Sequence, residues 1–359
     1  MAAGIAPVAV DAMGGDHAPA VVVQGAIDAA RKGRPILLVG PEERIRAELQ
    51  RQRASWSLPI QVKHAGEVVE MGDHPAQAMR RKRDNSVRVA LELVRAGEAS
   101  AMVSAGNSGA VMAGAIQVLG RAGAVQRPAI VSVLPAAKGN PLLLDVGANV
   151  ECRPLHLVQF GLMGEVYARR VFGVARPRVA VLANGTEPTK GTALTRAAAA
   201  ALALAPIRFQ GHCEGRDLLT GDLDVVVTDG FTGNVALKTM EGTAVALGRY
   251  MRDALRGTVP SKIGALFVKT ALLAVRRRVD WREVGGAPLV GVNGVVVIAH
   301  GASDARAVGN AIERARDAAR ADCTGQVAEA AATAAEWLAA AERESKGTSP
   351  RRRRAPLEA

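Results

Sequence analysis

Short apolar runs alternate along this chain with longer stretches in which apolar residues recur at helical spacing. The short runs predict buried strands because they are rich in β-branched residues and bounded by glycine, proline or asparagine; they lie at 7–12, 35–39, 60–64, 101–104, 141–146, 178–182, 225–227 and 295–299. The helical stretches include 86–95, 110–119 and 155–170, and a long C-terminal one that runs towards Glu344. This alternation predicts an α/β fold, a three-layer αβα sandwich of Rossmann-like type with a mainly parallel sheet.

Six of the predicted strands end in a turn with glycine that opens a helix. Ligands of parallel sheets bind beyond the carboxyl ends of the strands, so we expect all six turns at one edge, around one cleft. A single glycine turn is usually only a joint that needs a positive φ. These turns carry more polar side chains than turn formation requires, namely Asp11, Asp16, His17, Ser104, Asn107, Ser108, Asp145, Asn149, Lys190, Asp229, Thr232, Asn234, His300, Ser303 and Asp304.

The run 225–238 is the most informative of the six. Three valines are followed by Asp229, a glycine-containing turn and Asn234, which is expected to open a helix. Backbone N–H groups and the positive end of a helix dipole would then converge on one point, which suits an anion or a developing oxyanion. On the residues alone, Asn234 is a helix N-cap and Asp229 either caps its own turn or orients Lys190. The chain has neither GxGxxG nor GxxxxGK[ST] at its strand ends, so nucleotide binding is unsupported.

Length and composition narrow the class of protein. The 359 residues suffice for one large domain or two smaller ones, and we expect one domain over 1–345 with a basic disordered tail at 346–359. The net charge of +12 points to an acidic partner, while only 3% aromatic residues speak against stacking on single-stranded nucleic acid. Six His and three Cys lack metal-ligand spacing, so no metal site is expected.

Cellular location is predicted from what the sequence lacks. There is no signal-peptide pattern and no apolar run of about 18–20 residues, so we expect a cytoplasmic protein with reduced thiols. Of these thiols, Cys152 could carry an acyl group covalently. Its place three residues after a turn favours an inert, partly buried thiol instead.

Two basic features concern partners. The run Arg80, Arg81, Lys82 and Arg83 is either a solvated face or a docking surface for an acidic protein. The segment 261–276 is amphipathic, and the surrounding 250–285 is expected to project from the domain. Its apolar face, which includes Ile263, Phe267 and Leu272, either packs in a core or dimer interface or contacts an anionic membrane surface.

The turns also match one family. They carry, in order, Asp11-Ala-Met-Gly-Gly-Asp-His-Ala-Pro19, Ser104-Ala-Gly-Asn-Ser-Gly-Ala110, Leu144-Asp-Val-Gly-Ala-Asn149, Thr228-Asp-Gly-Phe-Thr-Gly-Asn234 and Ala299-His-Gly-Ala-Ser-Asp304. Together these closely resemble bacterial phosphate acyltransferase, from about Val8 to Arg320. Two departures are mild: Ser108 replaces the usual threonine, and Gly185-Thr-Glu-Pro-Thr-Lys190 keeps the lysine but varies the residues before it.

The resemblance implies a reaction and its residues. It implies a catalytic domain that makes acyl phosphate from fatty acyl-acyl carrier protein and inorganic phosphate, for phospholipid synthesis. It makes Lys190 and Asn234 the catalytic pair; from the residues alone, Lys190 is as well explained by a solvated surface. Expected substrate- and phosphate-binding residues are Asp11, Gly14, Gly15, His17, Ser104, Gly106, Asn107, Ser108, Asn149, Asp229, Thr232, Gly233 and His300. His17 and His300 are candidates for a general acid or a phosphate contact, and they suit a purely structural role as well.

The same resemblance bears on partners and on rival functions. It favours a homodimer without a cofactor and peripheral contact of 261–276 with the inner face of the cell membrane. The acidic partner that could dock on Arg80, Arg81, Lys82 and Arg83 would then be the carrier protein, with a solvated face as the alternative. The rival enzymes are a coenzyme A-dependent phosphate acetyltransferase and a decarboxylating dehydrogenase. The dehydrogenase is disfavoured because its metal-binding aspartate clusters and its nucleotide-binding loop are not found in this sequence. The non-enzymatic rival is a basic protein that binds membrane or nucleic acid.

Overall fold

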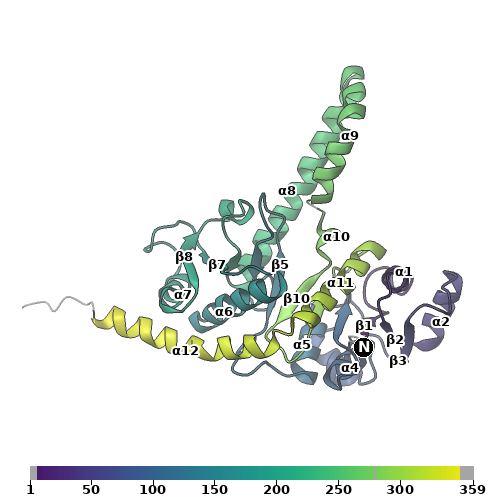
Figure 1. The fold of residues 1–359 in the computed structure, drawn as a ribbon, viewed down its shortest axis with the longest axis horizontal. Coiled ribbons are helices and arrows are strands. Elements are labelled where there is room, and N and C mark those ends of the chain that lie inside the picture. The colour runs from purple at the N-terminus through teal and green to yellow at the C-terminus, as the bar shows by residue number, and fades with distance from the viewer. Residues whose placement is uncertain (1–5, 279, 348–359) are drawn as a thin grey trace, which may run out of the picture.

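The computed structural model describes residues 6–278 and 280–347. Over this part of the chain, eleven strands form one sheet in the order β3-β2-β1-β4-β11-β10-β5-β6-β9-β7-β8. Helices cover both faces of the sheet (Figure 1), and the predicted three-layer αβα fold is confirmed. The predicted tail 346–359 lies outside the described residues, apart from the last two residues of the final helix.

The sheet consists of two parallel blocks that run in opposite directions. The first block contains β1 (Val8–Asp11), β2 (Ile36–Gly40), β3 (Ile60–His64), β4 (Ala101–Ser104) and β11 (Val296–Ile298). The second block contains β6 (Leu142–Leu144), β7 (Arg178–Leu182), β8 (Arg208–Cys213) and β9 (Val225–Val227). Between them lie β10 (Ala287–Val290) and β5 (Ala129–Val133), and the pairs β11–β10, β10–β5 and β5–β6 are all antiparallel.

This reversal corrects the expectation of one shared edge. The turns after β1, β4 and β11 gather at one edge of the sheet, which we call the first rim. The turns after β6, β7 and β9 gather at the opposite edge, the second rim. The expectation of a single cleft was wrong because three successive antiparallel pairings turn the second block around. Neither β5 nor β10 is among the predicted strands, so the expected strand set did not include the two strands that reverse the sheet.

Helices bury their apolar sides on each block. In the first block, α1 and α11 cover one face and α4 and α5 the other. In the second block, α6, α7 and α12 cover one face, and residues of α8 lie on the other. The bounds are α1 (Ala20–Arg31), α2 (Glu42–Arg51), α3 (Pro75–Arg81), α4 (Ser86–Arg95), α5 (Ser108–Val118), α6 (Pro154–Val171), α7 (Ala193–Leu204), α10 (Trp281–Val284), α11 (Ala305–Ala321) and α12 (Thr324–Gly347).

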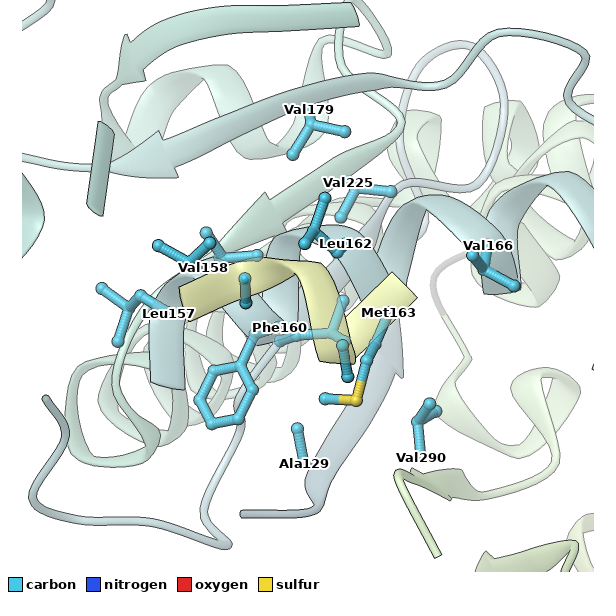
Figure 2. Packing of buried hydrophobic residues seen from close by; sticks show 14 of the residues in the cluster. Ala129, Leu157, Val158, Phe160, Leu162, Met163, Val166, Val179, Val225 and Val290 are labelled. Carbon is cyan, nitrogen blue, oxygen red and sulfur yellow. The ribbon is translucent and has the colours of Figure 1, made fainter. Parts of the chain in front are cut away.

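Helix α6 occupies the centre of the largest hydrophobic cluster. Figure 2 shows Phe160 and Met163 of α6 among side chains from neighbouring elements, including Val225 of β9 and Val290 of β10. Twelve of its eighteen residues are buried, which agrees with a helix that is apolar nearly all round. Gly164 allows the closest approach, because a Cβ atom there would lie 2.6 Å from Cγ1 of Val225. Burial on this scale fixes β6 and β9, which end at the second rim.

A helical hairpin projects from this body (Figure 1). It consists of α8 (Gly230–Gly257) and α9 (Val259–Arg278), which pack against each other. The expected projecting range of 250–285 therefore covers only the last turns of α8 together with α9. The short helix α10 at the end of that range contacts α11 of the body. The first helix of the hairpin begins about twenty residues earlier than expected, at the second rim, and its residues Ala236, Leu237 and Met240 still pack on the body.

Candidate active site

Two turns of the first rim meet around Asp11. The Asp11 carboxylate is buried and accepts hydrogen bonds from Ser104 Oγ (2.7 Å) and from the Met13 N–H (3.1 Å). Burial raises the pKa of Asp11, although these hydrogen bonds oppose the shift. A Cβ atom on Gly14 would lie 2.6 Å from the amide nitrogen of Gly106, so only glycine allows the two turns to approach this closely.

The third turn of the first rim joins through backbone contacts. The N–H of Asp16 donates to the carbonyl of Gly301 (2.8 Å), next to His300. Asn107 caps α5 by accepting the Ala110 N–H (3.1 Å), and its amide donates to the carbonyls of Met71 and Asp73 (both 3.1 Å). The first rim thus brings together nine of the expected binding residues, three of them with exposed side chains. The nine are Asp11, Gly14, Gly15, His17, Ser104, Gly106, Asn107, Ser108 and His300, of which His17, Ser108 and His300 are exposed.

The second rim is built around Asp145, one of the polar side chains of the predicted turns, for which no binding or catalytic role is predicted from the sequence. Its carboxylate is fully buried and accepts the N–H groups of Ile130, Gly147, Ala148 and Asn149 at 2.7–3.3 Å, together with the Asn149 side-chain amide at 2.9 Å. Burial raises the pKa of Asp145, against the effect of these donors. One carboxylate therefore fixes the whole turn after β6.

The first turn of α8 is pressed against the turn that Asp145 organises. Gly233 leaves no room for a Cβ atom beside the Asp145 carbonyl oxygen, and the Gly230 N–H donates to the Asn149 carbonyl at 2.7 Å. Asp229 is the N-cap of α8, since its carboxylate accepts both the N–H and the hydroxyl of Thr232 at 2.8 Å. The capping interpretation of Asp229 is confirmed.

Asn234 does not open the helix, contrary to expectation. Asp229 caps α8 five residues earlier, because a short carboxylate after β9 reaches the amide three residues on. Asn234 instead lies in the second turn with an exposed side chain, 3.9 Å from the point where a Cβ on Gly147 would stand. The N–H groups of Gly230, Thr232 and Gly233 already have acceptors within the protein. Side chains, more than these backbone amides, are therefore available to a ligand at this helix start.

Lys190 lies in the turn after β7, and β7 is the neighbour of β9 in the sheet. Its backbone N–H donates to the Glu187 carbonyl (2.9 Å), and the following Gly191 N–H donates to Asn184 Oδ1 (2.8 Å). A Cβ atom on Gly185 would lie 2.7 Å from Lys190 Cγ, so the lysine side chain crosses directly over this glycine. Lys190, Asn149 and Asn234 thus share the second rim, with the lysine exposed to solvent.

Cys152 lies close to this rim, but its thiol has the properties of an unreactive one. Its Sγ lies 3.6 Å from the Asn149 carbonyl oxygen, and the thiol is partly buried. Burial, together with the negative charge of Asp145, raises the pKa of Cys152 to about 11. The thiol is therefore protonated at neutral pH, which favours the inert interpretation.

The basic run near residue 80 divides into two parts. Lys82 is half-buried and donates to Asp73 Oδ2 (2.6 Å) and to the Val68 carbonyl (2.7 Å). It therefore holds α3 to the preceding loop, which differs from the docking role expected for it. The exposed Arg80 and Arg81, with His74, Ala76 and Gln77, line an open depression of about 460 Å³.

The hairpin exposes many large apolar side chains. Phe267 is 85% exposed and Ile263 54% exposed, whereas Leu272 is half-buried. Further exposed residues extend along both helices to the second rim, including Phe231, Val235, Val245, Leu247, Tyr250, Val259, Leu266 and Val268. Among the helices of residues 6–278 and 280–347, none combines the length and the hydropathy that a membrane span needs.

Comparison with known proteins places the chain in a family. The family described as "Fatty acid synthesis protein" matches residues 6–326. A phosphate acyltransferase of Anaeromyxobacter sp. (strain Fw109-5) is 69% identical over 349 residues, 97% of each chain. The phosphate acyltransferase of Geobacter sulfurreducens is 50% identical over 323 residues, 90% of this chain and 93% of that protein.

Solved structures share the fold at low identity. A phosphotransacetylase from Streptococcus pyogenes has a TM-score of 0.58 at 16% identity and covers 88% of this chain and 94% of its own. A 4-hydroxythreonine-4-phosphate dehydrogenase from Klebsiella pneumoniae has a TM-score of 0.54 at 17% identity over 88% and 99% of the two chains. These two likenesses concern the fold alone, whereas identities of 50–69% over nearly the whole length decide the family. This chain is a member of the fatty acid synthesis protein family, among the phosphate acyltransferases.

Proposed function

We propose that the protein transfers a fatty acyl group from the thioester of acyl-acyl carrier protein to inorganic phosphate. A phosphate oxygen attacks the thioester carbonyl carbon, a C–O bond forms, and the C–S bond then breaks. The products are acyl phosphate and the carrier thiolate, which takes up a proton. The observation that carries the proposal is the second rim, where Lys190 and Asn234 follow neighbouring strands in a chain related to phosphate acyltransferases.

The two residues suit the two charges of this reaction. Phosphate is already anionic at neutral pH, so it needs positioning and charge neutralisation more than a strong base. The Lys190 ammonium is exposed and supplies that charge. The Asn234 amide donates to the carbonyl oxygen as it becomes an oxyanion. Gly147 leaves space beside Asn234 for an acyl carbonyl to approach, since even a Cβ atom there would lie 3.9 Å from the Asn234 side chain.

The test compares site variants with a matched lysine variant. Lys190→Ala and Asn234→Ala should each lower kcat for acyl phosphate formation by about 10²–10³-fold. Lys238→Ala is the control, because this exposed lysine lies one turn beyond Asn234 on α8 and pairs with Glu241 at 2.8 Å. It should keep wild-type kcat. Product formation from acetyl-coenzyme A but not from acyl-acyl carrier protein would favour the acetyltransferase instead.

Carrier-protein docking is proposed for the depression on α3. Arg80 and Arg81 line it, Arg83 is exposed nearby in sequence, and acyl carrier proteins are acidic. Replacing Arg80 and Arg81 by Ala should raise KM for the carrier substrate several-fold, with a smaller effect at high salt. Arg44→Ala on α2 and Arg95→Ala on α4, which remove exposed arginines elsewhere, are the controls. Unchanged KM in the double variant would reject this docking surface.

We propose that the projecting hairpin contacts a second copy of the chain near its base and a membrane surface through α9. Exposed apolar residues near its base, such as Phe231 and Val235, suit a homodimer contact. Those of α9, including Ile263 and Phe267, suit the inner face of an anionic membrane because Lys262 and Lys269 lie on the same helix. Phe267→Asp should abolish flotation with anionic liposomes. Val235→Asp should instead shift the mass measured by light scattering towards the monomer.

A further inference from the structure

We propose that His212 is a positioning residue for Lys190, which it holds in place through the carbonyl group of Glu187. The inference rests on the proposed function, in that Lys190 is taken to act on substrate. His212 is not among the expected site residues, and it does not lie on a predicted strand. It is the fifth residue of β8, the outermost strand beside β7.

Lys190 and His212 both make a hydrogen bond to the Glu187 carbonyl oxygen. It accepts the backbone N–H of Lys190 at 2.9 Å and faces His212 Nδ1 at 3.3 Å. Because a carbonyl only accepts, the imidazole must carry its proton on Nδ1 to make this hydrogen bond. Glu187 itself is exposed, so its peptide would be mobile without a buried partner. His212 supplies that partner from a strand within the sheet.

A β-bulge turns His212 towards the lysine turn. In the β7–β8 pairing, Val179 lies opposite Phe209, and Val181 lies opposite His212, so two residues of β8 face one residue of β7. The extra residue reverses which side chains face each side of the sheet beyond that point. Gly211 in the bulge has φ +85°, a conformation that glycine adopts without strain. Without the bulge, His212 would face the other side of β8.

Burial of His212 makes the hydrogen bond to Glu187 important for this imidazole. The residue is only 7% exposed, and among the described residues its Nε2 atom has no hydrogen-bond partner. Within the part of the chain that the structure describes, the Nδ1–H bond to Glu187 is therefore the one hydrogen bond of this imidazole. A buried donor that loses its acceptor is costly, so the imidazole and the Glu187 peptide hold each other in position.

The consequence for Lys190 follows from the geometry of its turn. The side chain crosses Gly185 at contact distance, so its direction depends on where the backbone of residues 187–190 stands. Release of the Glu187 carbonyl would move the Lys190 Cα and swing the ammonium group away from its place on the rim. A displacement of about 1 Å can lower a catalytic rate by up to about 100-fold.

Three variants test the proposal. Asn places an amide N–H where Nδ1 stands, whereas Leu has similar bulk without a donor. His212→Leu should therefore lower kcat at least tenfold with little change in KM for the carrier substrate, and His212→Asn should stay within threefold of wild type. In Lys190→Ala/His212→Leu, kcat should equal that of Lys190→Ala, because a residue that acts through Lys190 has no effect once the lysine is gone.

The outcomes separate this inference from the proposed function. Wild-type kcat in His212→Leu, or a double variant clearly slower than Lys190→Ala, overturns the positioning role while leaving Lys190 in place. Equal losses in His212→Leu and His212→Asn also overturn it, since the donor would then be irrelevant. Wild-type kcat in Lys190→Ala overturns the role of the lysine itself, and the inference with it. Thermal unfolding of each variant confirms that the compared proteins are folded.

Discussion

Gly233 of α8 lies so close to the backbone carbonyl of Asp145 that no Cβ atom fits between them. Asp145 directly follows β6 and organises the turn there, while Gly233 is in the first turn of the helix that carries Asn234. The two turns of the second rim are therefore in direct backbone contact. A change of one methyl group at this contact should be felt at the active site.

Gly233→Ala should displace the start of α8 and lower both stability and activity. Overpacking of this kind costs about 1–3 kcal/mol. The matched control is Gly242→Ala on the same helix, where a Cβ atom would meet nothing within 4 Å. That control should stabilise the helix by about 0.5–1 kcal/mol, because alanine is the better helix former. Thermal unfolding and kcat of the two variants are the measurements, and equal behaviour would contradict the contact.

Gly185→Ala should impair catalysis without unfolding the protein. Its Cβ atom would stand 2.7 Å from Lys190 Cγ, and the flexible lysine can move away while the backbone stays in place. We expect a kcat reduced roughly tenfold, at an unfolding temperature close to that of wild type. Gly215→Ala, where a Cβ atom meets nothing within 4 Å, is the control for both quantities. A wild-type kcat in Gly185→Ala would show that catalysis does not depend on the position of the Lys190 side chain over Gly185.

Cys152→Ala should retain kcat within about twofold of wild type. Burial and the nearby charge of Asp145 raise the pKa of this thiol to about 11, so at pH 8 only about one thiol in a thousand is ionised. Mass spectrometry of the enzyme mixed with acyl-acyl carrier protein, without phosphate, should show no acylated protein. An acyl group retained on Cys152 would contradict direct attack by phosphate.

Asp224→Asn should destabilise the fold but leave kcat unchanged. Asp224 accepts two side-chain hydrogen bonds from Arg178 at 2.8 and 3.0 Å, where β7 and β9 begin, at the end of these strands away from the second rim. Loss of this paired carboxylate costs about 2 kcal/mol. Thermal unfolding and the kinetic assay separate the two effects, and a reduced kcat would contradict a purely structural role.

The same ion pair predicts a pH dependence of stability. Burial alone would raise the pKa of Asp224, but Arg178 outweighs it, and the pKa is lowered from its ordinary value. A carboxyl group with a depressed pKa in the folded state contributes its stability above its unfolded pKa of about 3.9. The difference in unfolding temperature between wild type and Asp224→Asn should thus be constant from pH 6 to 8. It should shrink below about pH 4, and a difference that grows on acidification would contradict the pairing.

The sequence predicted the layers of the fold but not the direction of its second half. Buried strands and amphipathic helices leave periodic signals, and these identified eight strands and the αβα class. Two of the antiparallel pairings, β10–β11 and β5–β6, join strands close in sequence, but the relative direction of the blocks also depends on β5 and β10, which pair across more than 150 residues. The two rims could therefore not be separated from the pattern alone.

Individual site residues show the same limit. Asp229 was predictable as a cap because its carboxylate bonds only three residues away, in a local geometry that turn chemistry describes. Lys82 looked like part of a charged surface, yet its ammonium group reaches Asp73 and Val68 across a loop. His212 was missed because its relation to Lys190 passes through a backbone carbonyl and a bulge, and neither has a signature in side-chain spacing.

Helix α8 has a mechanical consequence. It runs for 28 residues without a break, which at 1.5 Å per residue is about 42 Å, and Asn234 lies near one end of it. The other end leads within two residues into α9, which carries the exposed Phe267. The projecting hairpin and the proposed active site are thus joined by one continuous helix. Because α8 has no break between its ends, a force on the far end of the hairpin would be carried along one continuous helix to the turn that holds Asn234.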